Sequence, residues 1–349
     1  MTPEQVYCNT TPFKRTQLHW LQHDHHQEFY IRSIHESADG LGIVYLMNQF
    51  LELVVASERE EALQKDDLLK LAPPLRIAAN LGPESYAEEA RKVLQQYNAD
   101  VKVSAVFLRG KVSTSDAAQP ARLDMDMSTN VTTSILKACK ENGITITHAF
   151  HAALALSMMK LNPPPKGRSV YPFDLSINIR DTLQAPYRGS KQPAALYSTS
   201  HFTSIPMPEH RVNLKEIFLP LARDFRDSYT KVREDPHLIA MQKTIFDTII
   251  RSAQTQTEGQ GAAPEIIPGP SNYGNLDKAL KTKYHENLVV ERFFYGVQMR
   301  GSSQMAIWTY QGQFHMAFCF DHGDLDETIL KELMAVTVET LLSSLGVAR

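Results

Sequence analysis

The chain has 349 residues, of which 43% are hydrophobic and 21% charged, enough apolar material for one large domain or two ordinary ones. Its formal net charge of -3 gives no overall basic field, so we expect no nucleic-acid partner. No apolar run approaches the roughly 18 residues of a membrane helix, and the N-terminus lacks a signal-peptide pattern. We therefore expect no membrane partner and a cytoplasmic location.

Residue types that commonly bind metals do not form a recognisable site. The three cysteines are far apart and odd in number, which fits a reducing compartment and neither a disulfide framework nor a zinc motif. Residues 19–26 contain four histidines, His19, His23, His25 and His26. Because no second ligand cluster is apparent, we interpret these histidines as structural or solvated and predict no metal.

The most informative pattern joins a strand to a helix. Residues 28–34 are strand-like and lead directly into His35, which is followed by Asp39 and Gly40 in a His-x-x-x-Asp-Gly motif. Residues 41–52 then carry apolar side chains at helical spacing. An imidazole at the end of a strand, with a glycine-permitted turn behind it, can act as a general base. The motif therefore predicts that His35 takes a proton from a hydroxyl or amine during acyl transfer.

The rest of the first half predicts one more αβ unit. Residues 83–97 have a helical pattern, and residues 101–108 alternate as a strand. The apolar periodicity then lapses over small and polar residues. We interpret residues 112–121 as a crossover between an N-terminal subdomain, 1–111, and a C-terminal subdomain, 122–349.

The second half alternates helices with strands. The patterns predict helices over 128–142, 146–159 with Thr145 as cap, 213–234, 237–253 and 325–345, and strands over 170–180, 305–310 and 313–320. His148 and His151 are expected in the core or at the helix start. Residues 252–263 lack apolar anchors and predict a mobile loop. The fold class is mixed α/β, with mixed sheets flanked by helices and a cleft or tunnel between the subdomains.

Two further segments complete the predicted site. Asp39 is expected to act through structure, because a buried carboxylate needs a cationic partner and Arg180, at the end of the strand over 170–180, can pair with it. Residues 268–275 read as a loop. Its polar groups could stabilise an oxyanion or line the acyl site, and the residues concerned are Ser271, Asn272, Tyr273 and Gly274. An ordinary turn is the alternative interpretation of this loop.

Taken in order, these motifs resemble the CoA-dependent acyltransferase superfamily, which includes chloramphenicol acetyltransferase, condensation domains and fungal trichothecene O-acetyltransferases. His35 to Gly40 resembles the catalytic motif, and residues 173–180 resemble the strand whose arginine pairs with the motif aspartate. The resemblance implies two chloramphenicol-acetyltransferase-like subdomains with an interface tunnel. Only 34 residues precede the motif, so we expect a shortened N-terminal subdomain.

The resemblance implies transfer of an acyl group, with acetyl expected, from acyl-CoA to a hydrophobic small molecule in fungal secondary metabolism. Acyl-CoA would be a co-substrate, no bound cofactor is expected, and we expect a monomer. Two alternatives stay open. One is a condensation-like protein that uses a carrier-protein-bound donor or catalyses a ring-forming step, and the other is a non-catalytic relative that binds a small molecule or partner.

Overall fold

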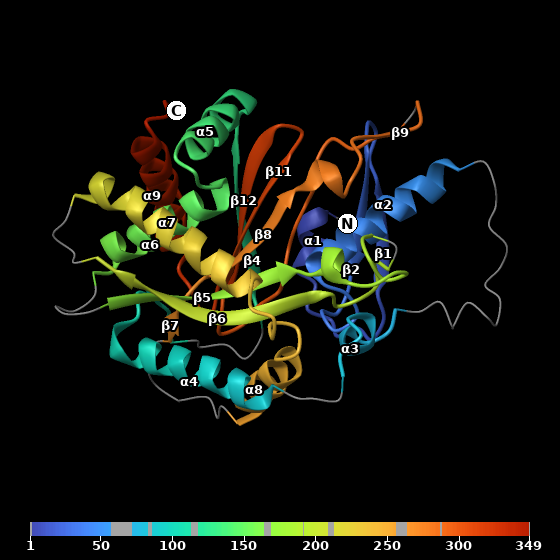
Figure 1. Cartoon of the computed structure of the whole chain (residues 1–349). Helices are drawn as coiled ribbons and strands as arrows, with labels where there is room; N and C mark the ends of the chain where they lie inside the picture. Colours follow the sequence, from blue (N-terminus) through green and yellow to red (C-terminus); the bar gives the residue numbers. More distant parts are fainter. Residues whose placement is uncertain are drawn as a thin grey trace.

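The computed structural model describes residues 2–56, 72–82, 86–112, 118–163, 169–190, 192–208, 213–255, 264–286 and 288–348 (Figure 1). Within these ranges the helices are α1 Pro3–Tyr7, α2 Gly40–Val55, α3 Leu75–Ala78, α4 Ala87–Ser104, α5 Thr129–Glu141, α6 Ile146–Leu161, α7 Leu214–Arg233, α8 Gln242–Thr255 and α9 Glu327–Leu345. The strands are β1 Gln17–Gln22, β2 Gln27–Arg32, β3 Leu108–Arg109, β4 Pro120–Met127, β5 Ser169–Asn178, β6 Ser198–Met207, β7 Glu265–Ile266, β8 Gly269–Asn275, β9 Lys283–Tyr284, β10 Leu288–Val289, β11 Gln304–Tyr310 and β12 Gln313–Asp321.

A mixed sheet with the order β4-β12-β11-β8 forms the centre of the fold. Strands β11 and β12 form the predicted hairpin, and Gln311 and Gly312 at its turn have positive φ angles of 52° and 75°, as a tight hairpin turn requires. Strand β4 pairs antiparallel with β12, whereas β8 pairs parallel with β11. The mixed α/β class is therefore confirmed.

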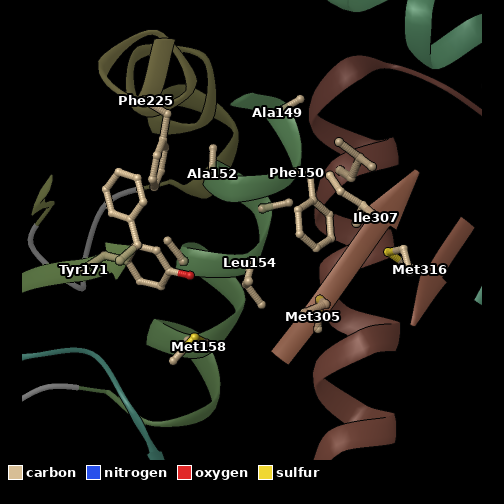
Figure 2. Close-up of a cluster of buried hydrophobic side chains, with 14 of the residues drawn as sticks. Ala149, Phe150, Ala152, Leu154, Met158, Tyr171, Phe225, Met305, Ile307 and Met316 are labelled. Carbon is tan, nitrogen blue, oxygen red and sulfur yellow. The ribbon is translucent and has the colours of Figure 1, made fainter. Parts of the chain in front are cut away.

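Helix α6 is the core helix on one side of this sheet. The side chain of Thr145 caps its first turn by accepting a hydrogen bond from the backbone of His148, as predicted. Its middle residues are fully buried, and Figure 2 shows Phe150, Leu154 and Met158 among side chains from the strands and the neighbouring helices. His151 is buried as well, with Nε2 2.9 Å from the hydroxyl of Tyr229.

A second ladder, β5 with β6, lies between two groups of helices. Figure 1 shows α6 and α7 on one side of it and α4 and α8 on the other. The predicted strand over 101–108 is wrong in most of its length, since α4 continues to Ser104 and packs on β5 and β6. Only Leu108 and Arg109 form a short strand, with β7.

The N-terminal part consists of the β1–β2 hairpin and helix α2. The predicted strand is β2, and its partner β1 has no counterpart among the predicted strands. Among the described residues no single helix is long and apolar enough to cross a membrane. Helices α5 and α6, which are bent by 97° at their junction, reach the length and apolar composition of a membrane span only when they are taken together. Residues 113–117 and 256–263, within the predicted crossover and loop, lie outside the described residues.

Candidate functional site

The predicted partners Asp39 and Arg180 form a buried ion pair. Arg180 follows β5 in a short 3₁₀ turn, Arg180–Thr182, and Asp39 precedes α2. The Nη1 atom of Arg180 donates to both carboxylate oxygens of Asp39, at 2.9 and 2.8 Å. The two residues are only 1% and 4% exposed, so the pair is shielded from solvent and from salt.

Backbone groups complete the bonding of this pair. Asp39 is the N-cap of α2, because its Oδ1 accepts from the N–H of Gly42 at 2.8 Å. Its Oδ2 accepts from the N–H of Tyr197 at 2.8 Å, and the Nη2 atom of Arg180 donates to the carbonyl of Ala195 at 3.0 Å. One network therefore joins the start of α2, the turn after β5 and the segment that leads into β6.

Removing the charge of Asp39 is expected to destabilise the fold. In Asp39→Asn the guanidinium of Arg180 stays buried without its counter-ion, which typically costs about 3–5 kcal/mol. Urea denaturation of the purified variant measures this loss. Asp181→Asn, which changes an exposed carboxylate in the next position, is the matched control. Its free energy of unfolding should be close to that of the unsubstituted protein. Equal stability of the two variants would contradict the structural role of Asp39.

His35 lies in the turn between β2 and α2, and its side chain is exposed. It lines a cavity of about 2730 Å³, and Asp39, Gly40 and all four residues from Ser271 to Gly274 line the same cavity. The cavity is several times larger than the roughly 300–1,000 Å³ of a typical small-molecule site. The geometry thus brings the two predicted parts of the site to one space that is large enough for two ligands.

Tyr273 connects the two parts directly. A Cβ atom added to Gly40 would lie 2.2 Å from the Oη atom of Tyr273, so the tyrosine hydroxyl packs against the first residue of α2. Burial raises the pKa of Tyr273 above its ordinary value and keeps the hydroxyl protonated. Gly40 is therefore required by close contact, since its φ is not in the left-handed region.

Gly40→Ala is expected to displace the side chain of Tyr273. A new methyl group in a packed contact typically costs about 1–3 kcal/mol. Gly82→Ala is the control, because a Cβ there meets nothing within 4 Å. The free energy of unfolding from urea titration should fall for the first variant and stay nearly constant for the second. No difference between them would argue that Tyr273 does not pack against the helix start.

The prediction of a loop over residues 268–275 is wrong. Residues Gly269–Asn275 form β8, which pairs parallel with β11 along the central sheet. The register shifts between Asn272 and Gly274, leaving Tyr273 as a bulge, and Gly274 adopts a φ of 68°. A bulge re-aims a side chain at a strand edge, and the extra residue here is the one that contacts Gly40.

The polar groups of β8 differ in their availability. The side-chain amide of Asn272 donates to the hydroxyl of Thr147 in α6, and its oxygen accepts from the N–H of Gly274 at 2.7 Å. Both polar groups of the Asn272 side chain therefore already have hydrogen-bond partners within the protein. The hydroxyl of Ser271 interacts with the hydroxyl of Tyr273. The hydroxyl of Tyr273 also interacts with that of Tyr295 and lies against the start of α2, so Ser271 and Tyr273 are the two predicted donors whose hydroxyl groups lie close to each other.

An aromatic wall of the cavity is absent from the sequence predictions. Phe293 and Tyr295 line the cavity together with Tyr273, and their ring centroids lie 6.3 and 5.0 Å from that of Tyr273. The segment has no regular secondary structure, so no periodicity marks it. The consecutive aromatic residues Phe293, Phe294 and Tyr295 were the only available signal, and they provide an apolar surface.

Asp174 is a titratable group in the cavity wall that was not predicted from the sequence. It lies on β5, four residues before the strand end, and lines the cavity. Burial raises the pKa of Asp174 to about 7, against the opposing effects of hydrogen bonds from Ser200 and His201. The carboxyl group is therefore partly protonated near neutral pH.

The raised pKa predicts a pH-dependent stability term. Between about pH 4 and pH 7 the folded chain keeps a proton on Asp174 that the unfolded chain has released, so stability falls as pH rises through this window, by up to about 4 kcal/mol. In Asp174→Asn this term disappears, and the pH dependence flattens. Urea titrations from pH 4 to 8 on both proteins measure it, with Asp181→Asn as control. Parallel pH profiles would contradict a raised pKa.

Comparison with known proteins finds fungal acetyltransferases. The chain is 27% identical to the O-acetyltransferase pigM of Monascus ruber over 356 residues, covering 99% of this chain and 67% of pigM. It is 23% identical to the azaphilone biosynthesis cluster protein M of Aspergillus terreus, covering 90% of this chain and 76% of that protein. No protein-family model matches the chain.

Solved structures share the fold of this chain. The structure of the trichothecene 15-O-acetyltransferase TRI3 from Fusarium sporotrichioides superposes with a TM-score of 0.79 at 17% identity, covering 96% of this chain and 72% of TRI3. The first condensation domain of the CDA synthetase gives a TM-score of 0.63 at 11% identity, covering 95% of this chain and 67% of that domain chain. The chain therefore has the fold of TRI3 and of condensation domains, which confirms the fold that the resemblance implied. The relatives in sequence thus include one fungal O-acetyltransferase, pigM, and one protein of a fungal biosynthesis cluster.

Proposed function

We propose that this protein transfers an acetyl group from acetyl-CoA to a hydroxyl or amine of an apolar secondary metabolite, with His35 as general base. The observation that carries the proposal is the anchored turn before α2, which presents His35 to the cavity that Ser271 and Tyr273 also line. The similarity to the fungal O-acetyltransferase pigM supports the reaction type. The division into two subdomains and a tunnel between them are part of this proposal.

The proposed step balances without any further reactant. A ring nitrogen of His35 accepts the proton of the acceptor hydroxyl while the oxygen of that hydroxyl bonds to the thioester carbonyl carbon. The hydroxyl groups of Ser271 and Tyr273 are suited to donate to the oxyanion that forms on the carbonyl. The C–S bond then breaks, and the coenzyme thiolate receives the proton from His35. The products are the acetyl ester and free CoA.

The cavity walls support an apolar acceptor. Phe293 and Tyr295 offer flat aromatic faces beside Tyr273, and such faces bind planar apolar groups. On β5 and β6, by contrast, Ser176 and Ser200 are polar cavity residues. We infer that the aromatic wall holds the body of the acceptor and that acetyl-CoA approaches from another part of the cavity.

Substitution of His35 tests the mechanism. His35→Ala should lose about 10²–10⁴-fold in turnover and keep its stability, because the side chain is exposed. The measurement is release of the CoA thiol from acetyl-CoA in the presence of a panel of polyketide alcohols, with product identified by mass. The matched control is His25→Ala, an exposed histidine that lines the same cavity. Unchanged turnover in His35→Ala would remove His35 from the mechanism.

The choice of donor separates the proposal from its alternatives. The same assay with an acetylated carrier protein in place of acetyl-CoA should give slower turnover. Faster turnover with the carrier would favour a condensation-like protein. Stabilisation by CoA or acceptor without any product, in a folded protein, would favour a non-catalytic relative.

A further inference from the structure

The β1–β2 hairpin carries a cluster of side chains that the proposed reaction does not use. The turn between the strands holds His23 and His26, and Glu28 follows on β2. The Nε2 atom of His23 lies 3.3 Å from Oε2 of Glu28, and Nε2 of His26 lies 3.4 Å from Oε1. The two imidazole rings are stacked, with centroids 4.4 Å apart. Two imidazole nitrogens and the two oxygens of one carboxylate therefore lie close together.

These separations fit a metal ion. With zinc–ligand bonds of about 2.0–2.2 Å, neighbouring atoms of a tetrahedral site lie roughly 3.3–3.5 Å apart. The Nε2 atom of His23 lies in that range from Oε2 of Glu28 and the Nε2 atom of His26 from Oε1, and one ligand atom from each of the three residues lies within 4.8 Å of the others. Two histidines and one glutamate are also a known zinc ligand set that leaves a fourth position for water.

The backbone and a neighbouring hydroxyl hold this arrangement. The N–H of His23 donates to the carbonyl of His26 at 3.0 Å and closes the turn. The hydroxyl of Tyr30 donates to Oε2 of Glu28 at 3.3 Å. A hydrogen bond to a ligating carboxylate from outside the ligand set is typical of metal sites, because it orients the ligand.

We propose that His23, His26 and Glu28 bind one divalent transition-metal ion of the zinc type. The two histidines are exposed, so the ion has access from solvent. His26 and Glu28 also line the large cavity, which places the ion at the cavity rim. The sequence prediction of no metal rested on the lack of a second ligand cluster, whereas the folded hairpin places Glu28 beside His23 and His26.

Titration of the metal-free full chain, without any histidine tag, with Zn²⁺ tests the site. Competition with a chromophoric zinc indicator gives stoichiometry and affinity independently of any enzyme activity. We expect one Zn²⁺ per chain, and a loss of affinity of at least about tenfold in His23→Ala, His26→Ala and Glu28→Gln, since even outer-shell partners contribute that much. Zn²⁺ should also raise the Tm of the unsubstituted protein more than that of the three variants.

Two controls keep the result interpretable. His285→Asn replaces an exposed histidine with positive φ by a residue that tolerates that conformation, and it should bind Zn²⁺ as the unsubstituted protein does. Circular dichroism establishes that each variant is folded. The proposal is overturned if the unsubstituted protein binds no Zn²⁺ at 100-fold excess over protein, or if the His23→Ala and His26→Ala variants bind it unchanged.

Discussion

The ion pair between Asp39 and Arg180 is the interaction on which the site depends. Placing both charges in the interior costs several kcal/mol of desolvation for each ion. Five hydrogen bonds offset that cost: two from Nη1 of Arg180 to Asp39, one each from the N–H groups of Gly42 and Tyr197 to Asp39, and one from Arg180 to the carbonyl of Ala195. Because the partners come from segments 141 positions apart, the pair forms only when both halves of the chain have folded. Its geometry then fixes the start of α2.

The position of His35 follows from that constraint rather than from contacts of its own ring. Within the described part of the chain nothing forms a hydrogen bond to the ring, and the side chain is exposed to the cavity. The turn before α2 is held at Asp39 by the ion pair and at Gly40 by the hydroxyl of Tyr273. A free ring on a fixed backbone suits a group that must exchange a proton with a substrate.

Local pattern predicted the elements whose partners are near in sequence. Helices α2, α5, α6 and α9 and the β11–β12 hairpin follow from periodicity, caps and a turn. The errors lie where distant pairing decides the structure. Residues 268–275 contain proline, glycine and asparagine, which favour a loop, yet pairing with β11 makes them a strand. Strand β6 lacked a recognised pattern because its partner β5 and the helices α4 and α8 define it. The geometry of the Asp39–Arg180 pair could not be predicted without the fold, because the partners are 141 positions apart. The role of Asp39 as the N-cap of α2, by contrast, could have been predicted from the sequence.

Because Ser271 and Tyr273 lie on strand β8, the hydroxyl groups proposed to bind the oxyanion have fixed positions. A donor on a flexible loop must be ordered during each catalytic cycle, whereas a donor on a strand is already positioned when substrate arrives. Ser271 lies opposite Ala306 in the parallel ladder, and Tyr273 is the bulged residue whose hydroxyl meets α2. The sheet that forms the core therefore also sets the distance between the hydroxyl groups and the turn that carries His35, and stability and site geometry depend on the same contacts.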